Sequence, residues 1–98
     1  MKIEISDEAD EDLISGFAFY EKNEPGLGAY FLDSLFSDID SLRLYVGIHP
    51  IIQGSHRCLS RRFPFAIYYR VENEVVRVRA ILDCRSRPSR IQRRLSGQ

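Results

Sequence analysis

The sequence has few of the features that mark membrane, secreted or metal-dependent proteins. Its 98 residues contain no tryptophan, one methionine and two cysteines. No apolar run approaches the roughly 20 residues that a membrane-spanning helix needs. An acid interrupts the first five residues, and no apolar stretch of the kind found in signal peptides follows them. We therefore expect a cytoplasmic protein that does not associate with a membrane.

The two cysteines, Cys58 and Cys84, form no CxxC pair and have no His or Cys nearby at metal-ligand spacing. The acids between residues 7 and 12 are typical of the first turns of a helix rather than of a metal site. The sequence has no nucleotide-binding, zinc-protease or serine-hydrolase motif. We expect no metal and no cofactor, with both cysteines acting as small apolar residues on strands; a reactive thiol or a disulfide is the alternative.

The net charge of zero hides a division between the two halves of the chain. Residues 1–53 carry eleven acids and three bases, a net charge of −8. Residues 54–98 carry eleven arginines, no lysine and three acids, a net charge of +8. Arginine grips carboxylates and phosphates in two places and stacks on rings. The second half therefore suits an anionic partner, either nucleic acid or an acidic protein segment. Alternatively, the two halves neutralise each other in the fold.

Helical periodicity dominates the first half of the chain, after a short strand predicted at Ile3–Ile5. Ser6 is a good N-cap for a helix over 7–23, whose apolar residues recur every three or four positions. Pro25 and Gly26 break this pattern. A second and stronger stripe runs from Gly28 to Val46 and ends at Gly47 and Pro50. Two such helices joined by a short break predict an antiparallel helical hairpin. The apolar positions of the second helix are Gly28, Leu32, Leu35, Ile39, Leu42 and Val46.

After residue 53 the apolar period falls from 3.6 to 2, which indicates strands. We expect a short strand at about 55–60 and a hairpin formed by 63–71 and 76–82 around the turn Glu72-Asn73-Glu74. Pro88 predicts a short final helix over Ser89–Leu95.

The chain is thus predicted to be one α+β domain, 1–98, in the order β-α-α-β-β-β. The helical hairpin would cover one face of an antiparallel sheet, because each needs the other to bury its apolar side.

Alternation of side chains places a group of polar residues on the sheet face away from the hairpin. Clustered arginines with a tyrosine there could hold a phosphate backbone, or receive an acidic segment of a partner. The alternative for each arginine is a solvated charge that pairs with the acidic helices. The candidate binding residues are Arg57, Arg61, Tyr68, Arg70, Arg77, Arg79, Arg85 and Arg87.

Few side chains on this face could carry protons in catalysis. Cleavage of RNA through the 2′-hydroxyl needs a proton acceptor, a proton donor and cations. His49 lies in a loop and His56 at a strand start, where surface or partly packed histidines are expected. Tyr68 and Asp83 remain as proton carriers if Arg79 and Arg85 hold phosphate. We therefore expect a binding protein rather than an enzyme.

The strand pattern resembles that of a known family. The run 61–71, beginning Arg-Arg-Phe-Pro-Phe, and the run Val75–Leu82 are similar to the RelE/ParE superfamily of bacterial toxins, formerly called plasmid stabilisation proteins. The likeness extends over residues 3–95, including the Phe31-Leu32 helix. It implies the same β-α-α-β-β-β fold and the toxin role in a type II toxin–antitoxin module, with a cognate antitoxin as partner.

Function within this superfamily divides, and the resemblance leaves three hypotheses. ParE-like members resemble inhibitors of DNA gyrase, and the absence of Tyr or His after Tyr69 favours this type. RelE-like members resemble ribosome-dependent endoribonucleases that cut mRNA. Many relatives carry His-x-Arg-Arg-Asp-Pro where this chain has residues 83–88, and Trp where it has Ile91. That departure supports a third hypothesis, a non-toxic relative that only binds its partner.

Overall fold

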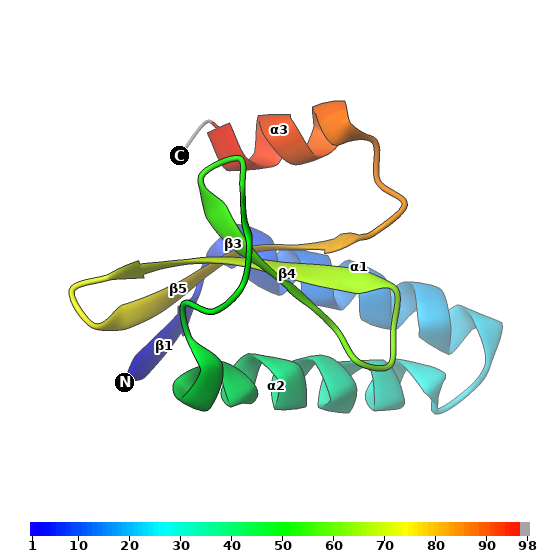
Figure 1. The fold of residues 1–98 in the computed structure, drawn as a ribbon. Coiled ribbons are helices and arrows are strands. Elements are labelled where there is room, and N and C mark those ends of the chain that lie inside the picture. The colour runs from blue at the N-terminus through cyan, green and yellow to red at the C-terminus, as the bar shows by residue number, and fades with distance from the viewer. Residues whose placement is uncertain (97–98) are drawn as a thin grey trace.

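The computed structural model describes residues 1–96, so the last two residues of the predicted domain lie outside the described residues. Two helices cover one face of a five-stranded sheet, and a short C-terminal helix lies on the other face (Figure 1). The predicted α+β order is confirmed, with an additional short strand before the second predicted one. The elements are β1 (Lys2–Ile5), α1 (Asp7–Asn23), α2 (Leu27–Tyr45), β2 (Ile51–Ile52), β3 (Ser55–Leu59), β4 (Phe65–Glu72), β5 (Val75–Asp83) and α3 (Pro88–Ser96).

Local sequence signals fix the ends of several elements as predicted. The Ser6 hydroxyl accepts a hydrogen bond from the Ala9 amide at 3.1 Å, which caps α1. Gly26, between the two helices, has a φ of +90°, a conformation that favours glycine. Asn73 and Glu74 both have positive φ, which gives the β4–β5 hairpin a tight turn whose twist matches its strands.

The sheet has the order β1-β5-β4-β3-β2. All neighbouring pairs are antiparallel except β1 and β5, which are parallel. A fully antiparallel sheet was predicted, so this pairing differs. The four strands from β2 onward are consecutive and short turns force them to alternate in direction. The helical hairpin separates β1 from them and imposes no such constraint.

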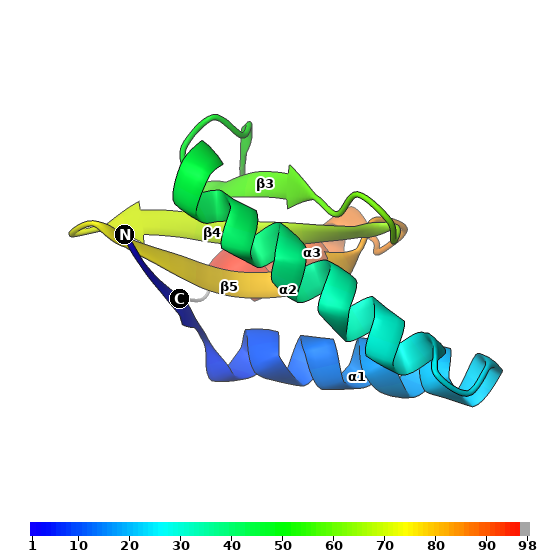
Figure 2. The same cartoon turned by 90° about the horizontal axis from the view of Figure 1, so that it is seen from below.

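The main core lies between the helical hairpin and the sheet, as Figure 2 shows for α1 and α2 on the same side of the strands. The apolar stripe of α2 meets alternate residues of β4 and β5, as predicted. Buried members of this cluster include Leu13, Phe31, Leu35, Ile39, Leu42, Ile67, Tyr69, Val76 and Val78.

A bulge in β5 creates a second core that the sequence pattern did not predict. Tyr68 pairs with Ala80 and Tyr69 with Val78, so Arg79 is an extra residue in β5. Beyond it the alternation inverts: Ile81 joins the main core, while Ala80 and Leu82 turn to the opposite face. Strict alternation predicted the reverse for these three residues. The second cluster is covered by α3 and consists of Ala66, Tyr68, Ala80, Leu82 and Leu95, with Ile91 packed against it.

Glycine permits the close approach of α1 and α2. A Cβ on Gly28 would lie 2.8 Å from both the ring of Phe17 and its carbonyl oxygen. We expect Gly28→Ala to lower the free energy of unfolding by about 1–3 kcal/mol, because the Phe17 backbone cannot move aside cheaply. Alanine in place of glycine within an exposed helix normally stabilises by about 1 kcal/mol. Urea denaturation therefore tests the sign of the effect, and a more stable variant would contradict this packing.

Candidate anion-binding surface

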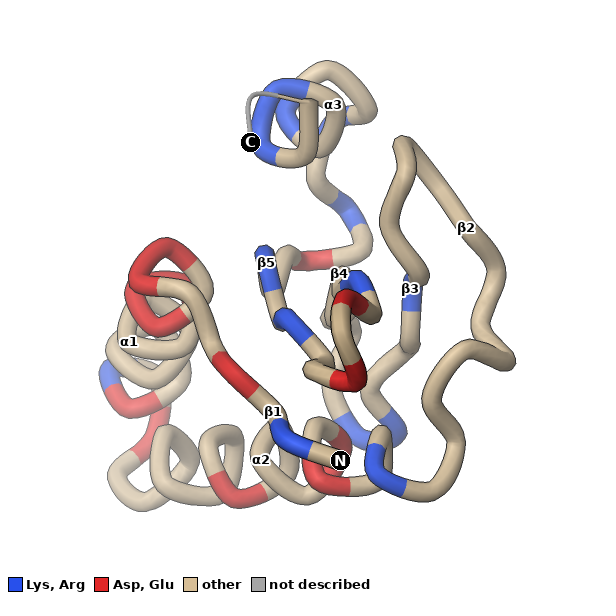
Figure 3. The backbone as a smooth tube through the Cα atoms, turned by 90° about the vertical axis from the view of Figure 1, so that its left-hand side faces the viewer, with Lys and Arg blue, Asp and Glu red and all other residues tan. Residues whose placement is uncertain are grey.

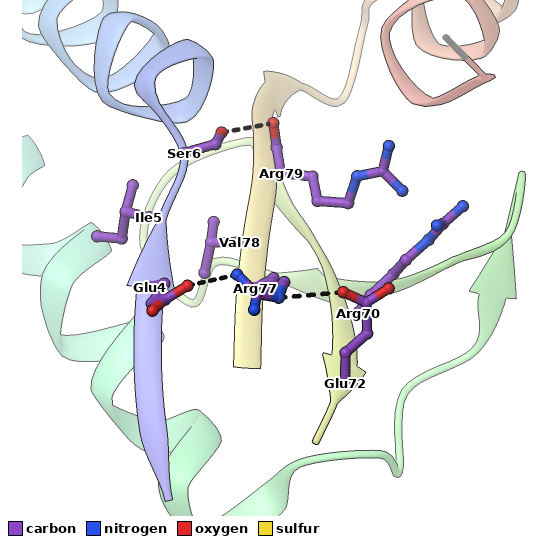
Figure 4. Close-up of a pocket in the computed structure, with 8 residues that line it drawn as sticks. All are labelled: Glu4, Ile5, Ser6, Arg70, Glu72, Arg77, Val78 and Arg79. Atoms are coloured by element: carbon purple, nitrogen blue, oxygen red, sulfur yellow. Dashed lines mark hydrogen bonds and ion pairs between the residues drawn. The ribbon is translucent and has the colours of Figure 1, made fainter. Parts of the chain in front are cut away.

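A cleft of about 390 Å³ opens over the ends of β1, β4 and β5, on the face away from the helical hairpin (Figure 4). Three of the predicted arginines line it, because Arg70 and Arg77 are paired across β4 and β5 and the bulge adds Arg79. Its lining residues are Glu4, Ile5, Ser6, Arg70, Glu72, Arg77, Val78 and Arg79.

Arg77 is largely neutralised within this cleft. Its guanidinium lies between two carboxylates, with an ion pair to Glu4 and a second one of 3.0 Å from Nε to Glu72 Oε1. Figure 4 shows this row of acid, base and acid crossing the three strands. Arg77 therefore holds β1 to the β4–β5 hairpin rather than presenting an open positive charge.

Arg79 and Arg70 extend together away from that row (Figure 4). Arg79 is only 7% exposed, and its Nη2 donates to the Leu95 carbonyl of α3 at 3.4 Å. Burial lowers the pKa of Arg79, and the nearby charge of Arg70 lowers it further. Arg70 Nε donates to the Gly54 carbonyl at 3.2 Å. Two cations placed this close favour a carboxylate or a phosphate group between them.

Arg57 and Tyr68 are paired across β3 and β4 on the same face, and Tyr68 lies beneath α3. Arg57 Nε donates to the Tyr68 hydroxyl at 3.2 Å, and Tyr68 is 1% exposed. The prediction that this face is polar therefore needs correction. Tyr68 and Arg79 do point away from the hairpin, as predicted. The helix α3 packs over them, and Tyr68 is part of the second core. Tyr68 is not available to stack an RNA base or transfer a proton in this conformation.

Arg61 and Arg85 lie apart from the cleft. Arg61 Nε bonds the buried carboxylate of Asp38 on α2 at 3.1 Å, which fastens the β3–β4 loop to the hairpin. Arg85 grips Asp83 with two bonds of 2.9 and 2.7 Å. That contact holds the pKa of Asp83 below its usual value, so this carboxyl stays ionised and cannot donate a proton near neutral pH.

The sequence pattern understated the role of α3. Its apolar pair, Ile91 and Leu95, is spaced by four and faces the sheet. Arg87, immediately before α3, and Arg90 and Arg93 within it are all exposed. We call these three residues the α3 arginines. Figure 3 shows basic residues on α3 and acidic ones on α1, so the charge division found in the sequence becomes a division in space.

The cysteines are both free, and only one has the predicted strand position. Cys58 is buried in β3 within the main core, and burial raises the pKa of its thiol. Cys84 is exposed just after β5. Among residues 1–96 there is no group of three or more His, Cys, Asp or Glu that could hold a metal ion, and no helix long and apolar enough to span a membrane.

A histidine and a tyrosine join the loop after α2 to the sheet, a contact that the sequence did not reveal. The Tyr69 hydroxyl accepts from the Gly47 amide at 3.0 Å and is hydrogen-bonded to Nδ1 of His49. The hydroxyl can donate its own proton to His49 or accept a second hydrogen bond from it, so the direction of this bond depends on the tautomer of the ring. The His56 ring stacks on Tyr69, with a centroid separation of 5.0 Å.

Stability should depend on pH through His49. Burial, followed by the proximity of His56, lowers the pKa of His49 from 6.5. In the unfolded chain this histidine binds a proton more readily, so the stability it contributes is present above pH 6.5 and is lost as the pH falls through the folded-state pKa. We expect the free energy of unfolding to decline from pH 7 to pH 5, and His49→Gln to flatten that decline. Equal slopes for the two proteins in urea titrations would contradict this assignment.

Comparison with known proteins gives a likeness to solved structures. No protein-family model and no curated protein matches this chain. Among solved structures it is similar to a chain of the "Chromosomal ParDE TA system from P. aeruginosa". The TM-score is 0.74 at 17% sequence identity, over 83% of this chain and 92% of the other. The two chains share a fold. At this identity the likeness concerns architecture, and the side chains of this surface must be interpreted on their own chemistry.

Proposed function

We propose that this chain is the toxin of a bacterial type II toxin–antitoxin module and belongs to the ParE-like branch of the RelE/ParE superfamily. The observation that carries the proposal is the fold shared with a chain of a ParDE system across most of both molecules. The sequences of the strand runs 61–71 and 75–82 also resemble those of the RelE/ParE superfamily, which supports the proposal independently of the fold. In this proposal the toxin acts in the cytoplasm by binding DNA gyrase and is neutralised by a cognate antitoxin.

Two observations favour a binding toxin over a RelE-like endoribonuclease. Tyr68, one of the two proton carriers named from the sequence, lies under α3. Asp83, the other, is paired with Arg85 and lies outside the cleft that Arg70 and Arg79 line. Cations for a phosphate are present in Arg70 and Arg79, but neither named group is placed to move a proton beside them.

Purified protein in a gyrase supercoiling assay tests the proposed target. Inhibition that depends on protein concentration is the expected result. Cleavage of translated mRNA, measured by primer extension without any effect on supercoiling, would favour the ribonuclease. If neither activity is found and expression does not slow growth, the chain is a non-toxic relative that only binds its partner.

A further inference from the structure

The sheet ends on an edge strand, β2, whose two side chains are both apolar and exposed. Ile51 is 66% exposed and Ile52 is 38% exposed. Proteins usually protect such edges with charged side chains, because an open edge is a template for another strand. On β2 the two residues that would carry that protection are isoleucines.

The hydrogen-bond pattern leaves the outer side of Ile51 open to a further strand. Ile51 pairs with His56 and Ile52 with Ser55, around a two-residue turn whose members both have positive φ. The Arg57 amide donates to the Pro50 carbonyl at 2.8 Å. Bonded and non-bonded pairs alternate in an antiparallel ladder, so the N–H and C=O groups of Ile51 point away from β3.

More apolar surface precedes this edge in the chain. Leu44 and Tyr45 end α2 and Ile48 follows in the loop, and their exposed fractions are 80%, 54% and 72%. Together with the two isoleucines of β2 they make five large exposed apolar residues within 44–52, which we call the edge patch. Exposed large apolar residues that cluster in one segment favour an interaction site there.

The charge beside β2 and β3 is mainly positive. From Ser41 to Val71 the chain contains five arginines and no acid, although Arg43 and Arg61 pair with Asp40 and Asp38 of α2. Figure 3 shows no acidic residue along β2 and β3. Arg57 and Arg70 bond neutral oxygens, of Tyr68 and Gly54, and neither has an ion pair within residues 1–96. An acidic partner is therefore complementary, whereas a second copy of this chain that paired through the same edge would bring like charges together.

We propose that β2 receives an extended, acidic segment of a protein partner, which adds a sixth strand to the sheet. The segment alternates apolar and acidic residues. Its apolar side chains lie on the side of Ile51, which shares a face with His56 and Tyr69. Its acids lie on the opposite face, with Arg57. The inference rests on the proposed function, since the antitoxin is the partner to which this chemistry is assigned.

The test uses the proposed antitoxin, taken as the product of the reading frame next to the gene for this chain, and measures its binding to three forms of the chain by calorimetry. Ile51→Asp should raise the Kd by about 30-fold or more, as expected when an apolar anchor is lost and a like charge is added. Ile14→Asp is the matched control, because Ile14 is also 66% exposed but lies on α1. It should change the Kd by less than about 2-fold. Thermal unfolding establishes that both variants fold.

Amide hydrogen exchange of the complex distinguishes strand addition from simple apolar contact, since only an added strand protects the Ile51 amide. Equal Kd values for the three forms, protection confined to α1 and α2, absence of binding by the wild type, or dimerisation through β2 would each overturn the proposal. Growth assays separate it from the proposed function. Ile51→Asp should still arrest growth and should escape rescue by the partner, whereas a wild-type chain that never arrests growth counts against the toxin role alone.

Discussion

Replacing Asp12 with alanine should lower the free energy of unfolding by about 3 kcal/mol, at the lower end of the cost of breaking a buried ion pair. The Asp12 side chain is 11% exposed and accepts two bonds from Arg94, of 2.9 and 2.8 Å. It also accepts from the Ile81 amide at 2.9 Å, just after the bulge in β5. One carboxylate thus joins α1, β5 and α3, and its loss leaves a guanidinium that is 17% exposed with only a longer ion pair of 3.8 Å to Glu8.

Urea denaturation of Asp12→Ala, with Asp10→Ala as control, measures this effect. Asp10 lies in the same helix but is exposed, so its replacement should change stability by less than about 0.5 kcal/mol. A double variant, Asp12→Leu with Arg94→Met, should recover part of the loss because it removes both charges. Similar costs for Asp12→Ala and Asp10→Ala would show that this tie does not hold α3 to the body.

Reversing the charge of the α3 arginines should abolish toxicity without unfolding the protein. These three side chains are exposed and none belongs to the second core, so glutamate at 87, 90 and 93 disturbs little packing. We expect inhibition of gyrase supercoiling to need about 100-fold more protein, equivalent to about 2.7 kcal/mol of binding energy. Circular dichroism and thermal unfolding establish that the fold is retained.

A second triple variant distinguishes the effect of where the charges lie from the effect of the net charge. Glutamate in place of Lys2, Lys22 and Arg43 changes the net charge by the same amount, on elements of the first half. Lys2 and Arg43 take part in exposed ion pairs that contribute little to stability, and Lys22 is exposed. This variant should keep its toxicity. Equal losses in the two triple variants would contradict a specific role for α3.

The order and ends of the elements could be predicted because each depends on local chemistry. Ser6 caps its helix through its own hydroxyl, and the turn at Asn73 needs only a residue that tolerates positive φ. The periods of 3.6 and 2 depend on which residues are apolar, and those residues do form the main core.

The candidate site was harder to predict because it depends on contacts between distant segments. The bulge at Arg79 has no local signal, yet it inverts the faces of Ala80, Ile81 and Leu82. The helix α3 was expected, but its docking over Tyr68 depends on the tie between Arg94 and Asp12, which are 82 residues apart. The sequence therefore predicted a cluster of arginines, and the structure divides it into a cleft, a helix surface and two internal ion pairs.

Induced expression of the chain in bacteria, alone and together with the product of the reading frame next to its gene, tests the toxin proposal most directly. Growth arrest by the chain alone, with DNA that loses negative supercoiling, and normal growth when the partner is present are the expected results. Normal growth and unchanged supercoiling on expression of the chain alone would contradict the proposed function.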